Sequence, residues 1–275
     1  MKFITKMGIA VSTIGLALFT ANGLNQKLVV KHYKYQHPNV KNSVRAAVIT
    51  DLHSNLIGED QADLMSLIDN QFPDVVFLVG DIVDEKLPQS QAELFLDQIV
   101  AKYPTYYVTG NHESYTKRGE QVKQMIEAKG IEVLAQESSL FTYNETTLQI
   151  TGIDDPTFLP PDIALFEAMH NHQSGPYVNV LLAHRPELIE DYLAYPFDII
   201  FSGHAHGGQW RIPGLINGLY APHQGLFPKY AGGEYNFNHT KLIVSRGLEN
   251  QKLDHIPRFY NRPEVVIVDF LPMEE

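Results

Sequence analysis

Five apolar residues, Val75 to Val79, follow one another without a polar interruption and end at Gly80 and Asp81. A short apolar run of mostly β-branched residues between turn residues is typical of a strand that is buried on both faces inside a parallel sheet. Such a strand presents the residue that follows it at the carboxyl edge of the sheet, where open α/β sheets bind their ligands. The sequence therefore places the carboxylate of Asp81 at the rim of a site.

Composition narrows the classes of protein that the chain can be. Its 275 residues, 44% of them hydrophobic, are enough for one sizeable core and fit a single α/β domain. The formal net charge of -11 argues against nucleic acid as a partner, because phosphate backbones are bound by Lys and Arg. Cysteine is absent, which excludes disulfides, a thiolate nucleophile and a zinc finger.

The beginning of the chain has the order of charged and apolar residues found in export signals. Two lysines precede an apolar run from Met7 to Ala21, so we expect a signal peptide or an uncleaved signal anchor in residues 1–24 and a single domain in residues 25–275. The run is short for a spanning helix, which needs about 20 apolar residues, and a buried first helix of the domain is the alternative. We expect anchoring in the cell membrane, or export, with the domain outside rather than in the cytoplasm.

Hydrophobic periodicity predicts two halves of different build. Strand and helix alternate in the first half, which indicates a parallel α/β layout, whereas short strands separated by turns in the second half indicate hairpins. Strands are expected at residues 28–35, 43–50, 75–79, 105–108, 131–134, 139–143, 147–153, 178–183, 197–201, 241–245 and 264–270. Helices are expected at residues 61–70, 88–102, 118–129, 161–172 and 186–194. We therefore expect an α/β fold of two packed mixed β-sheets flanked by helices, an α/β/β/α sandwich.

Five of the expected strands end in residues that can bind metal ions. These strand ends are Asp51-x-His53, Gly80-Asp81, Gly110-Asn111-His112, His184 and Gly203-His204-x-His206. Residues two apart on an extended chain point to the same side, so the D-x-H and H-x-H pairs each present two ligand atoms to one place. One such pair arises by chance, and a lone His or Asp is commonly a cap or a surface residue. Five strand ends of this kind in one chain indicate a site.

The ligand types indicate which ions the site would hold. Imidazole together with carboxylate suits Mn, Fe, Zn or Co rather than Ca or Mg. Two cations about 3.5–4 Å apart repel each other unless an anion lies between them. The strand-end Asp81 can be that bridging anion. We therefore expect two divalent metal ions per chain, with Mn, Fe and Zn as candidates.

In these motifs the chain resembles the calcineurin-like metallophosphoesterases. That family has the ordered pattern D-x-H, G-D-x-x-D, G-N-H-[ED], H and G-H-x-H, and each element is present between about Val44 and Phe270. The stretches from His204 to Gln209 and from Tyr220 to Tyr230 resemble the membrane-associated bacterial branch of the family, which includes small exported phosphodiesterases. The resemblance implies a metal-dependent phosphoric ester hydrolase.

The resemblance also implies a role for each motif residue. One ion would be held by Asp51, His53, Asp81 and His206, and the other by Asp81, Asn111, His184 and His204. A hydroxide between the ions would be the nucleophile and attack phosphorus in line. His112 would be the catalytic residue that assists the leaving oxygen, oriented by Asp51 rather than by Glu113.

Two further residues are candidates for substrate binding. His223, in Ala-Pro-His-Gln-Gly, could line the substrate side of the site, and a plain loop residue is the alternative. Arg246 follows a strand end and could clamp a phosphate bidentately, with a salt bridge as the alternative. The same two interpretations apply to Arg185. Asp84 is expected to support a ligand or a turn rather than to bind metal.

These residues favour an enzyme, a two-metal phosphoesterase that acts on a phosphodiester or a pyrophosphate. Its partner would be a phosphate-ester substrate that can be lipid-linked, and a lipid pyrophosphatase of the UDP-2,3-diacylglucosamine type is an alternative with the same chemistry. A non-catalytic scaffold with the same fold is the alternative from another class, and the intact ligand set argues against it. The acidic balance disfavours a nuclease.

Overall fold

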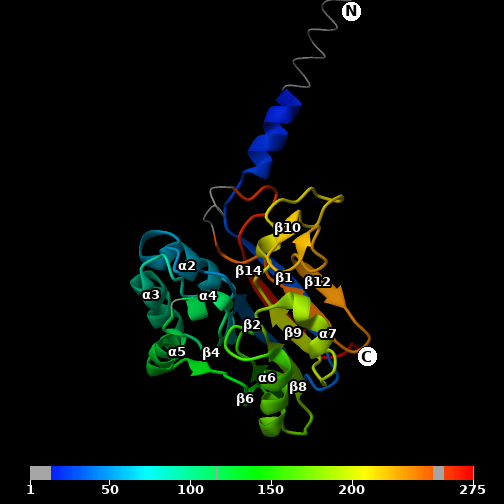
Figure 1. The fold of residues 1–275 in the computed structure, drawn as a ribbon. Coiled ribbons are helices and arrows are strands. Elements are labelled where there is room, and N and C mark those ends of the chain that lie inside the picture. Colours follow the sequence, from blue (N-terminus) through cyan, green and yellow to red (C-terminus); the bar gives the residue numbers. More distant parts are fainter. Residues whose placement is uncertain (1–13, 116, 250–256, 275) are drawn as a thin grey trace, which may run out of the picture.

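Two six-stranded sheets form the centre of the protein. The computed structural model describes residues 14–115, 117–249 and 257–274. In these residues the strands are ordered β1-β14-β2-β3-β4-β5 in one sheet and β12-β13-β9-β8-β7-β6 in the other. Helices pack on the outer face of each sheet (Figure 1). This arrangement confirms the expected α/β/β/α sandwich.

The bounds of the elements follow the expected order along the chain. The first sheet contains β1 (Val29–Gln36), β2 (Val44–Ile49), β3 (Val75–Val79), β4 (Thr105–Val108), β5 (Glu132–Val133) and β14 (Glu264–Leu271). The second contains β6 (Glu137–Tyr143), β7 (Thr146–Gly152), β8 (Val178–Leu182), β9 (Ile199–Ser202), β12 (Gly233–Asn236) and β13 (Lys241–Val244). A separate hairpin pairs β10 (Tyr220–Ala221) with β11 (Gly225–Leu226). The helices are η1 (Glu59–Gln61), α2 (Ala62–Asp69), α3 (Gln89–Val100), α4 (Asn111–Tyr115), α5 (Gly119–Ala128), α6 (Pro161–Ala168), η2 (Met169–Asn171), η3 (Pro186–Leu188), α7 (Ile189–Tyr192) and η4 (His206–Gly208).

Strand β3 is buried on both faces, as its apolar run predicts. Val75, Phe77 and Val79 belong to the core between the two sheets. Val76 and Leu78 belong to the core between the first sheet and helices α2, α3 and α5. Full burial stabilises an apolar side chain of this size by about 1.5–3 kcal/mol relative to exposure. The position of Asp81 at the end of this strand is therefore fixed by packing on two sides.

Parallel pairing brings the functional strand ends to one edge. β2, β3 and β4 are parallel neighbours in the first sheet, and β8 and β9 are parallel neighbours in the second. The two edges meet across the sandwich, because the backbone N–H of His204 after β9 donates to Asp51 Oδ1 after β2 at 2.9 Å. All five predicted strand ends therefore converge.

The sequence patterns were less accurate for short or exposed elements. The expected helix at 186–194 is the 3₁₀ turn η3 followed by the short α7, and the expected helix at 161–172 is α6 followed by η2. Strand β12 was not expected, because it is an edge strand whose alternate side chains are exposed and which begins at a glycine. Helix α4 was also missed, since it has only five residues.

The start of the described chain is an exposed helix. Residues 14–23 are helical and project from the end of the molecule that carries β10 (Figure 1). Ile14, Leu16 and Leu18 are 60%, 65% and 67% exposed, so this segment is not the buried first helix that was the alternative interpretation. Residues 1–13 of the predicted signal segment lie outside the described residues. In the described ranges, no helix combines the length and apolar character needed to cross a membrane.

Candidate metal centre

The predicted ligands form two adjoining groups that meet at Asp81. In one group, ligand atoms of Asp51, His53 and His206 all lie within 4.8 Å of one another. In the other, ligand atoms of Asp81, His184 and His204 do so. Asp81 Oδ2 lies 3.0 Å from His184 Nε2 and 3.7 Å from His53 Nε2, so one carboxylate oxygen faces both groups.

Every predicted ligand carries a buried polar atom that makes no hydrogen bond. These atoms are Asp51 Oδ2, His53 Nε2, Asp81 Oδ2, Asn111 Oδ1, His184 Nε2, His204 Nδ1 and His206 Nδ1. A buried polar atom without a hydrogen bond costs about 1–3 kcal/mol, and a cluster of such atoms demands a compensating interaction. Within the set, Asp81 Oδ2 and His184 Nε2 face each other at 3.0 Å, and His206 Nδ1 lies 3.1 Å from Glu249 Oε2. Nitrogen and carboxylate or amide oxygen are suitable donors for borderline divalent cations. The residues present therefore fit the binding of divalent metal.

The protonation of two imidazoles also fits metal binding, which requires a neutral ring. Burial and repulsion from His184 hold the pKa of His204 well below its ordinary value. Burial lowers the pKa of His206 to about 3. His184 differs, because the charge of Asp81 outweighs burial and raises its pKa to about 10. Its Nδ1 lies 2.9 Å from the carbonyl oxygen of Val79, which leaves Nε2 directed at the site.

The backbone at the ligands is bent into the left-handed region. Five of the ligands have positive φ angles, which non-glycine residues rarely adopt. The angles are 51° at Asp51, 49° at His53, 54° at Asp81, 64° at His204 and 46° at His206. Residues held in such conformations cost of order 1–3 kcal/mol each and gather at functional sites. Here the bends turn the chain sharply at each strand end, so that successive side chains return to one point.

Glycines next to the ligands allow this close approach. A Cβ at Gly80 would lie 2.4 Å from His184 Nδ1, and a Cβ at Gly110 would lie 2.2 Å from Asp81 Oδ1. These contacts explain the glycines of the G-D and G-N-H motifs. Gly247, which sequence reasoning missed, has the same role, because its Cβ would lie 2.6 Å from Asp51 Oδ2.

The carboxylate of Glu113 fixes the backbone around Asp81. Its Oε2 accepts the N–H groups of Asp81 and Gly110 at 3.1 and 2.8 Å. Its Oε1 accepts those of Ile82 and Val83 at 2.7 and 3.0 Å. Burial and the charge of Asp81 raise the pKa of Glu113. Glu113 therefore supports the centre from within the protein and does not reach His112 through any of these contacts.

His112 lies at the edge of the centre, and its side chain is 23% exposed. Its Nδ1 lies 2.7 Å from Glu85 Oε2 and 3.2 Å from Asp84 Oδ2. Burial opposes its charge, but the hydrogen bond to Asp84 and the charge of Asp81 outweigh burial and raise the pKa of His112 to about 9. The expectation that Asp51 orients His112 is wrong. Asp51 is buried and directed at the ligand group, whereas Asp84 and Glu85 lie on the loop that faces His112.

Asp84 supports two histidines at once. Its Oδ2 lies 3.2 Å from His53 Nδ1 as well as 3.2 Å from His112 Nδ1. Its other oxygen accepts the backbone N–H of Lys86 at 2.6 Å. Hydrogen bonding of the other ring nitrogen orients a metal-binding imidazole. This arrangement agrees with the prediction that Asp84 supports a ligand.

The structure brings His223 to the centre but not Arg246. His223 Nδ1 lies 2.8 Å from both His204 Nε2 and Arg185 Nη1. Arg185 forms a bidentate ion pair with Asp155 at 2.6 and 3.0 Å, which is the salt-bridge interpretation. The side chain of Arg246 pairs with Glu264 and lines a separate cavity without any of the predicted ligands. The prediction that Arg246 clamps the substrate at the centre is not supported by this placement.

Glu187 is a member of the site that sequence reasoning missed. Its Oε1 lies 3.9 Å from His204 Nε2 and 4.0 Å from His223 Nδ1. Burial raises the pKa of its carboxyl group. The residue lies in η3, three positions after His184, and no motif marks it. The one sequence signal for Glu187 was its position shortly after His184, at the end of a strand that carries a ligand.

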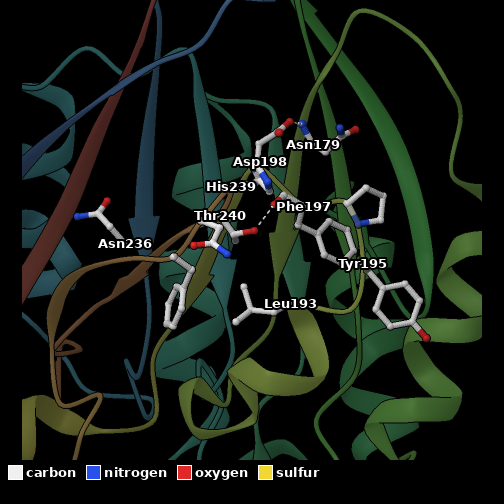
Figure 2. Close-up of a pocket in the computed structure, with 11 residues that line it drawn as sticks. Asn179, Leu193, Tyr195, Phe197, Asp198, Asn236, His239 and Thr240 are labelled. Atoms are coloured by element: carbon white, nitrogen blue, oxygen red, sulfur yellow. Dashed lines mark hydrogen bonds between the residues drawn. The ribbon is translucent and has the colours of Figure 1, made fainter.

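A cavity at the opposite edge of the second sheet is not part of this centre. It has a volume of about 730 Å³ and is lined by residues at the amino ends of β8, β9 and β13 (Figure 2). Thr240 Oγ1 donates to the carbonyl oxygen of Phe197 at 2.7 Å, and the backbone N–H of Asn179 donates to Asp198 Oδ2 at 2.7 Å. None of the predicted site residues lines it.

Comparisons with known proteins agree with the geometry. The family model for calcineurin-like phosphoesterases matches residues 44–208. An uncharacterised metallophosphoesterase of Campylobacter jejuni is 27% identical over 256 residues, which cover 90% of this chain and 65% of the relative. The phosphodiesterase YaeI of Escherichia coli is 25% identical over 217 residues, which cover 76% of this chain and 75% of the relative.

A vertebrate relative is also similar. The transmembrane protein with metallophosphoesterase domain of Danio rerio is 29% identical over 187 residues, which cover 62% of this chain and 42% of that protein. The chain thus spans just under two thirds of the length of the Campylobacter relative and less than half of the Danio one. The family match covers more than half of this chain and includes every predicted ligand. The chain belongs to the calcineurin-like phosphoesterase family.

Proposed function

We propose that the chain binds two divalent metal ions and hydrolyses a phosphodiester or a pyrophosphate, with His112 assisting the leaving group. The single observation that carries the proposal is the convergence of buried Asp, Asn and His ligand atoms around Asp81. Two separate ions are favoured over one because the ligand atoms form two groups, one of Asp51, His53 and His206 and the other of Asp81, His184 and His204. When bound, the ions would supply positive charge that activates water and stabilises charge on the phosphate oxygens.

The role of His112 rests on its position and charge. Its ring lies beside His53, with ring centres 4.4 Å apart, and it is exposed enough to reach a bound substrate. A pKa of about 9 keeps the imidazole protonated at neutral pH. Asp84 and Glu85 hold Nδ1, so Nε2 is left to donate a proton to the leaving oxygen.

A diester or pyrophosphate substrate is favoured over a simple monoester by similarity to YaeI, which is named a phosphodiesterase. His223 lies on the outer side of the centre, where its side chain is 51% exposed and can contact the part of the substrate beyond phosphorus. A lipid pyrophosphate is the second candidate. It is favoured by the exposed apolar helix at residues 14–23, which would keep the centre close to a membrane, with the domain outside the cell.

The test is hydrolysis by the full chain after chelation and return of Mn, Fe, Zn or Mg, followed as p-nitrophenol release from the p-nitrophenyl esters and as loss of the intact lipid pyrophosphate. Bis-p-nitrophenyl phosphate, p-nitrophenyl phosphate and a lipid pyrophosphate are compared as substrates. Asp81→Asn should lose both metal and turnover, whereas the control His172→Ala, a histidine outside the centre, should keep both. Two metals per chain and preferred cleavage of the diester or the pyrophosphate would support the proposal. A chain that binds no metal and cleaves none of the three would instead be the non-catalytic scaffold.

A further inference from the structure

The loop that follows the metal centre carries apolar side chains on the surface. We call residues 210–217 the apolar loop. It begins two residues after η4, which contains the ligand His206. Trp210, Ile212 and Leu215 are 43%, 36% and 78% exposed. Grouped apolar side chains on a surface mark a place of interaction with a partner or a membrane.

The apolar loop is fastened to the helix at residues 14–23 by aromatic packing. The ring of Phe259 lies 5.7 Å from that of Trp210 and 5.7 Å from that of Phe19. Tyr260 Oη donates to the carbonyl oxygen of Phe19 at 3.0 Å. Gly23 also packs on Phe259, because a Cβ at Gly23 would lie 2.2 Å from the ring. The loop and the apolar helix therefore belong to the same end of the molecule (Figure 1).

Behind the apolar loop is a cavity with two guanidinium groups. It has a volume of about 510 Å³, and its lining includes Arg211, Arg246, Leu215 and Tyr260. An adjoining cavity of about 380 Å³ shares both arginines and adds Lys31. A positively charged cavity with an apolar rim is unexpected on a chain whose net charge is -11.

The charges in this cavity are not balanced by its own acids. The two carboxylates nearby, Glu264 and Glu234, line the adjoining cavity. Glu264 pairs with Arg246, and Glu234 accepts from Lys241 at 2.9 Å. Arg211 Nη2 donates to Asn217 Oδ1, whereas Nη1 is buried and makes no hydrogen bond. Burial and the nearby charge of Arg246 lower the pKa of Arg211.

Gly232 permits this pairing of like charges. A Cβ at Gly232 would lie 2.8 Å from Arg246 Cγ and 3.1 Å from Arg211 Nη1. The backbone therefore leaves room for two guanidinium groups at a spot where they repel each other. A bound anion would remove the repulsion and supply the missing acceptor, since guanidinium groups bind phosphate through paired N–H donors.

We propose that this end of the molecule docks on a bilayer, with Arg211 and Arg246 binding the phosphate of an anionic phospholipid while Trp210, Ile212 and Leu215 enter the acyl region. A bilayer is favoured over a soluble anion because the cavity has an apolar rim and is continuous with the exposed apolar helix. The inference rests on the proposed function and adds to it the surface through which the protein would contact the membrane. Because the loop follows His206 directly, docking would bring the metal centre to the membrane surface, where a lipid-linked substrate lies.

The chain's single tryptophan is the probe for the first experiment, because it lies in the apolar loop. The full chain is transferred from detergent into vesicles of phosphatidylcholine, with or without phosphatidylglycerol, and Trp210 fluorescence is recorded. We expect a blue shift, quenching by brominated lipid, and stronger quenching with phosphatidylglycerol. If the chain is held by vesicles but Trp210 is not quenched, the helix alone anchors it and the proposal is wrong. Equal quenching in both vesicle types would refute the headgroup site.

Variants separate the charged cavity from the apolar rim. Arg211→Gln should lower binding to anionic vesicles about fivefold, the effect of one basic residue at a membrane surface, and leave binding to neutral vesicles unchanged. Arg118→Gln makes the same charge change at the N-cap of α5 and should have no effect. Leu215→Asp should reduce quenching about tenfold or more on both vesicle types, since an apolar side chain no longer enters the lipid. Leu215 is 78% exposed, so this change spares the core.

Two further measurements distinguish the possible failures. Asp81→Asn should abolish hydrolysis but keep the quenching of Trp210, so that docking and catalysis are judged separately. Titration of the chain with inorganic phosphate tests a soluble ligand. Tight phosphate binding that Arg211→Gln removes, together with no lipid quenching, would make the cavity a site for a free anion and overturn the proposal.

Discussion

Glu113 is buried beneath the metal centre, and changing it to Gln should disrupt the centre although Glu113 touches no predicted metal ion. Its two carboxylate oxygens accept four backbone N–H groups, two on each oxygen. In Glu113→Gln one oxygen becomes an amide NH₂. Whichever way the amide is oriented, two backbone N–H groups then face a donor in place of an acceptor.

The expected loss of stability follows from these contacts. A hydrogen bond to a charged group contributes about 1.5–3 kcal/mol, so two lost bonds correspond to about 3–6 kcal/mol. An opposing effect is the repulsion between Glu113 and Asp81, which the neutral amide removes and which is seen in the raised pKa of Glu113. We therefore expect a loss near the lower limit, about 3 kcal/mol. Metal affinity should fall about 10–100-fold, as for other residues that orient ligands.

The assay is urea unfolding of the full chain followed by circular dichroism, with and without metal, together with metal analysis of the purified protein. Glu120→Gln is the matched control, because Glu120 is an exposed carboxylate on α5 whose side chain is 71% exposed. An exposed ion pair contributes about 0–1 kcal/mol. If Glu113→Gln unfolded like the control and kept its metals, the role of the carboxylate as a backbone anchor would be refuted.

Three more predictions concern His112 and the glycines. His112→Ala should keep both metals and slow hydrolysis of bis-p-nitrophenyl phosphate about 10²-fold; an emptied metal site or unchanged turnover would contradict the assigned role. In the metal-free chain, the raised pKa of about 9 means that protonated His112 stabilises the fold fully below its unfolded pKa of about 6.5, and that this stabilisation is lost as the pH rises towards 9. Urea unfolding of wild type and His112→Ala should therefore differ most at pH 6 and converge above pH 9, and a constant difference would argue against the charge. Gly247→Ala should weaken metal binding at least tenfold, because its Cβ would lie 2.6 Å from Asp51 Oδ2. Gly225→Ala is the control: its φ of 71° is similar and the space around it is open, so it should only lose about 1 kcal/mol of stability.

The convergence of Asp and His side chains at one sheet edge could be predicted from sequence because each is placed by its own strand. A strand such as β3 is recognised from its continuous apolar run, and the residue after it must lie at the sheet edge. The D-x-H and H-x-H pairs do meet at the centre, but their residues have positive φ angles and not the extended backbone that the sequence argument assumed. The sandwich could also be predicted, since its sheets are built from buried strands with strong apolar patterns.

The groups around the ligands could not be predicted in the same way. His112 is oriented by Asp84 and Glu85, which precede it by 28 and 27 positions and reach it only through the fold. The choice between Asp51 and Glu113 was made from a family pattern, and both turned out to face elsewhere. Which of several nearby carboxylates meets an imidazole depends on loop conformation, and periodicity carries no information about it.

Arg246 illustrates how a sound local pattern can lead to the wrong partner. It follows strand β13, and residues after the ends of β2, β3, β4, β8 and β9 all enter the centre. Here the backbone does pass the centre, since Gly247 packs on Asp51, but the side chain points away to Glu264. Gly247 has a φ of 72°, and the chain bends here so that Gly247 faces Asp51 while the side chain of Arg246 faces the other side of the segment.

That alternation connects the two sites of the molecule. One side of the segment after β13 closes the ligand group at Asp51, and the other side supplies Arg246 to the cavity behind the apolar loop. On the segment that follows β9, His206 lies in the centre. Asn261 Nδ2 donates to the carbonyl oxygens of His206 and Gln209 at 2.6 and 3.2 Å, immediately before the apolar loop. Two short backbone segments therefore carry both the ligands and the groups proposed to meet lipid. If docking on a membrane shifted either segment, the shift would reach Asp51 or His206. An effect of the membrane on turnover should therefore be sought first at the metal centre.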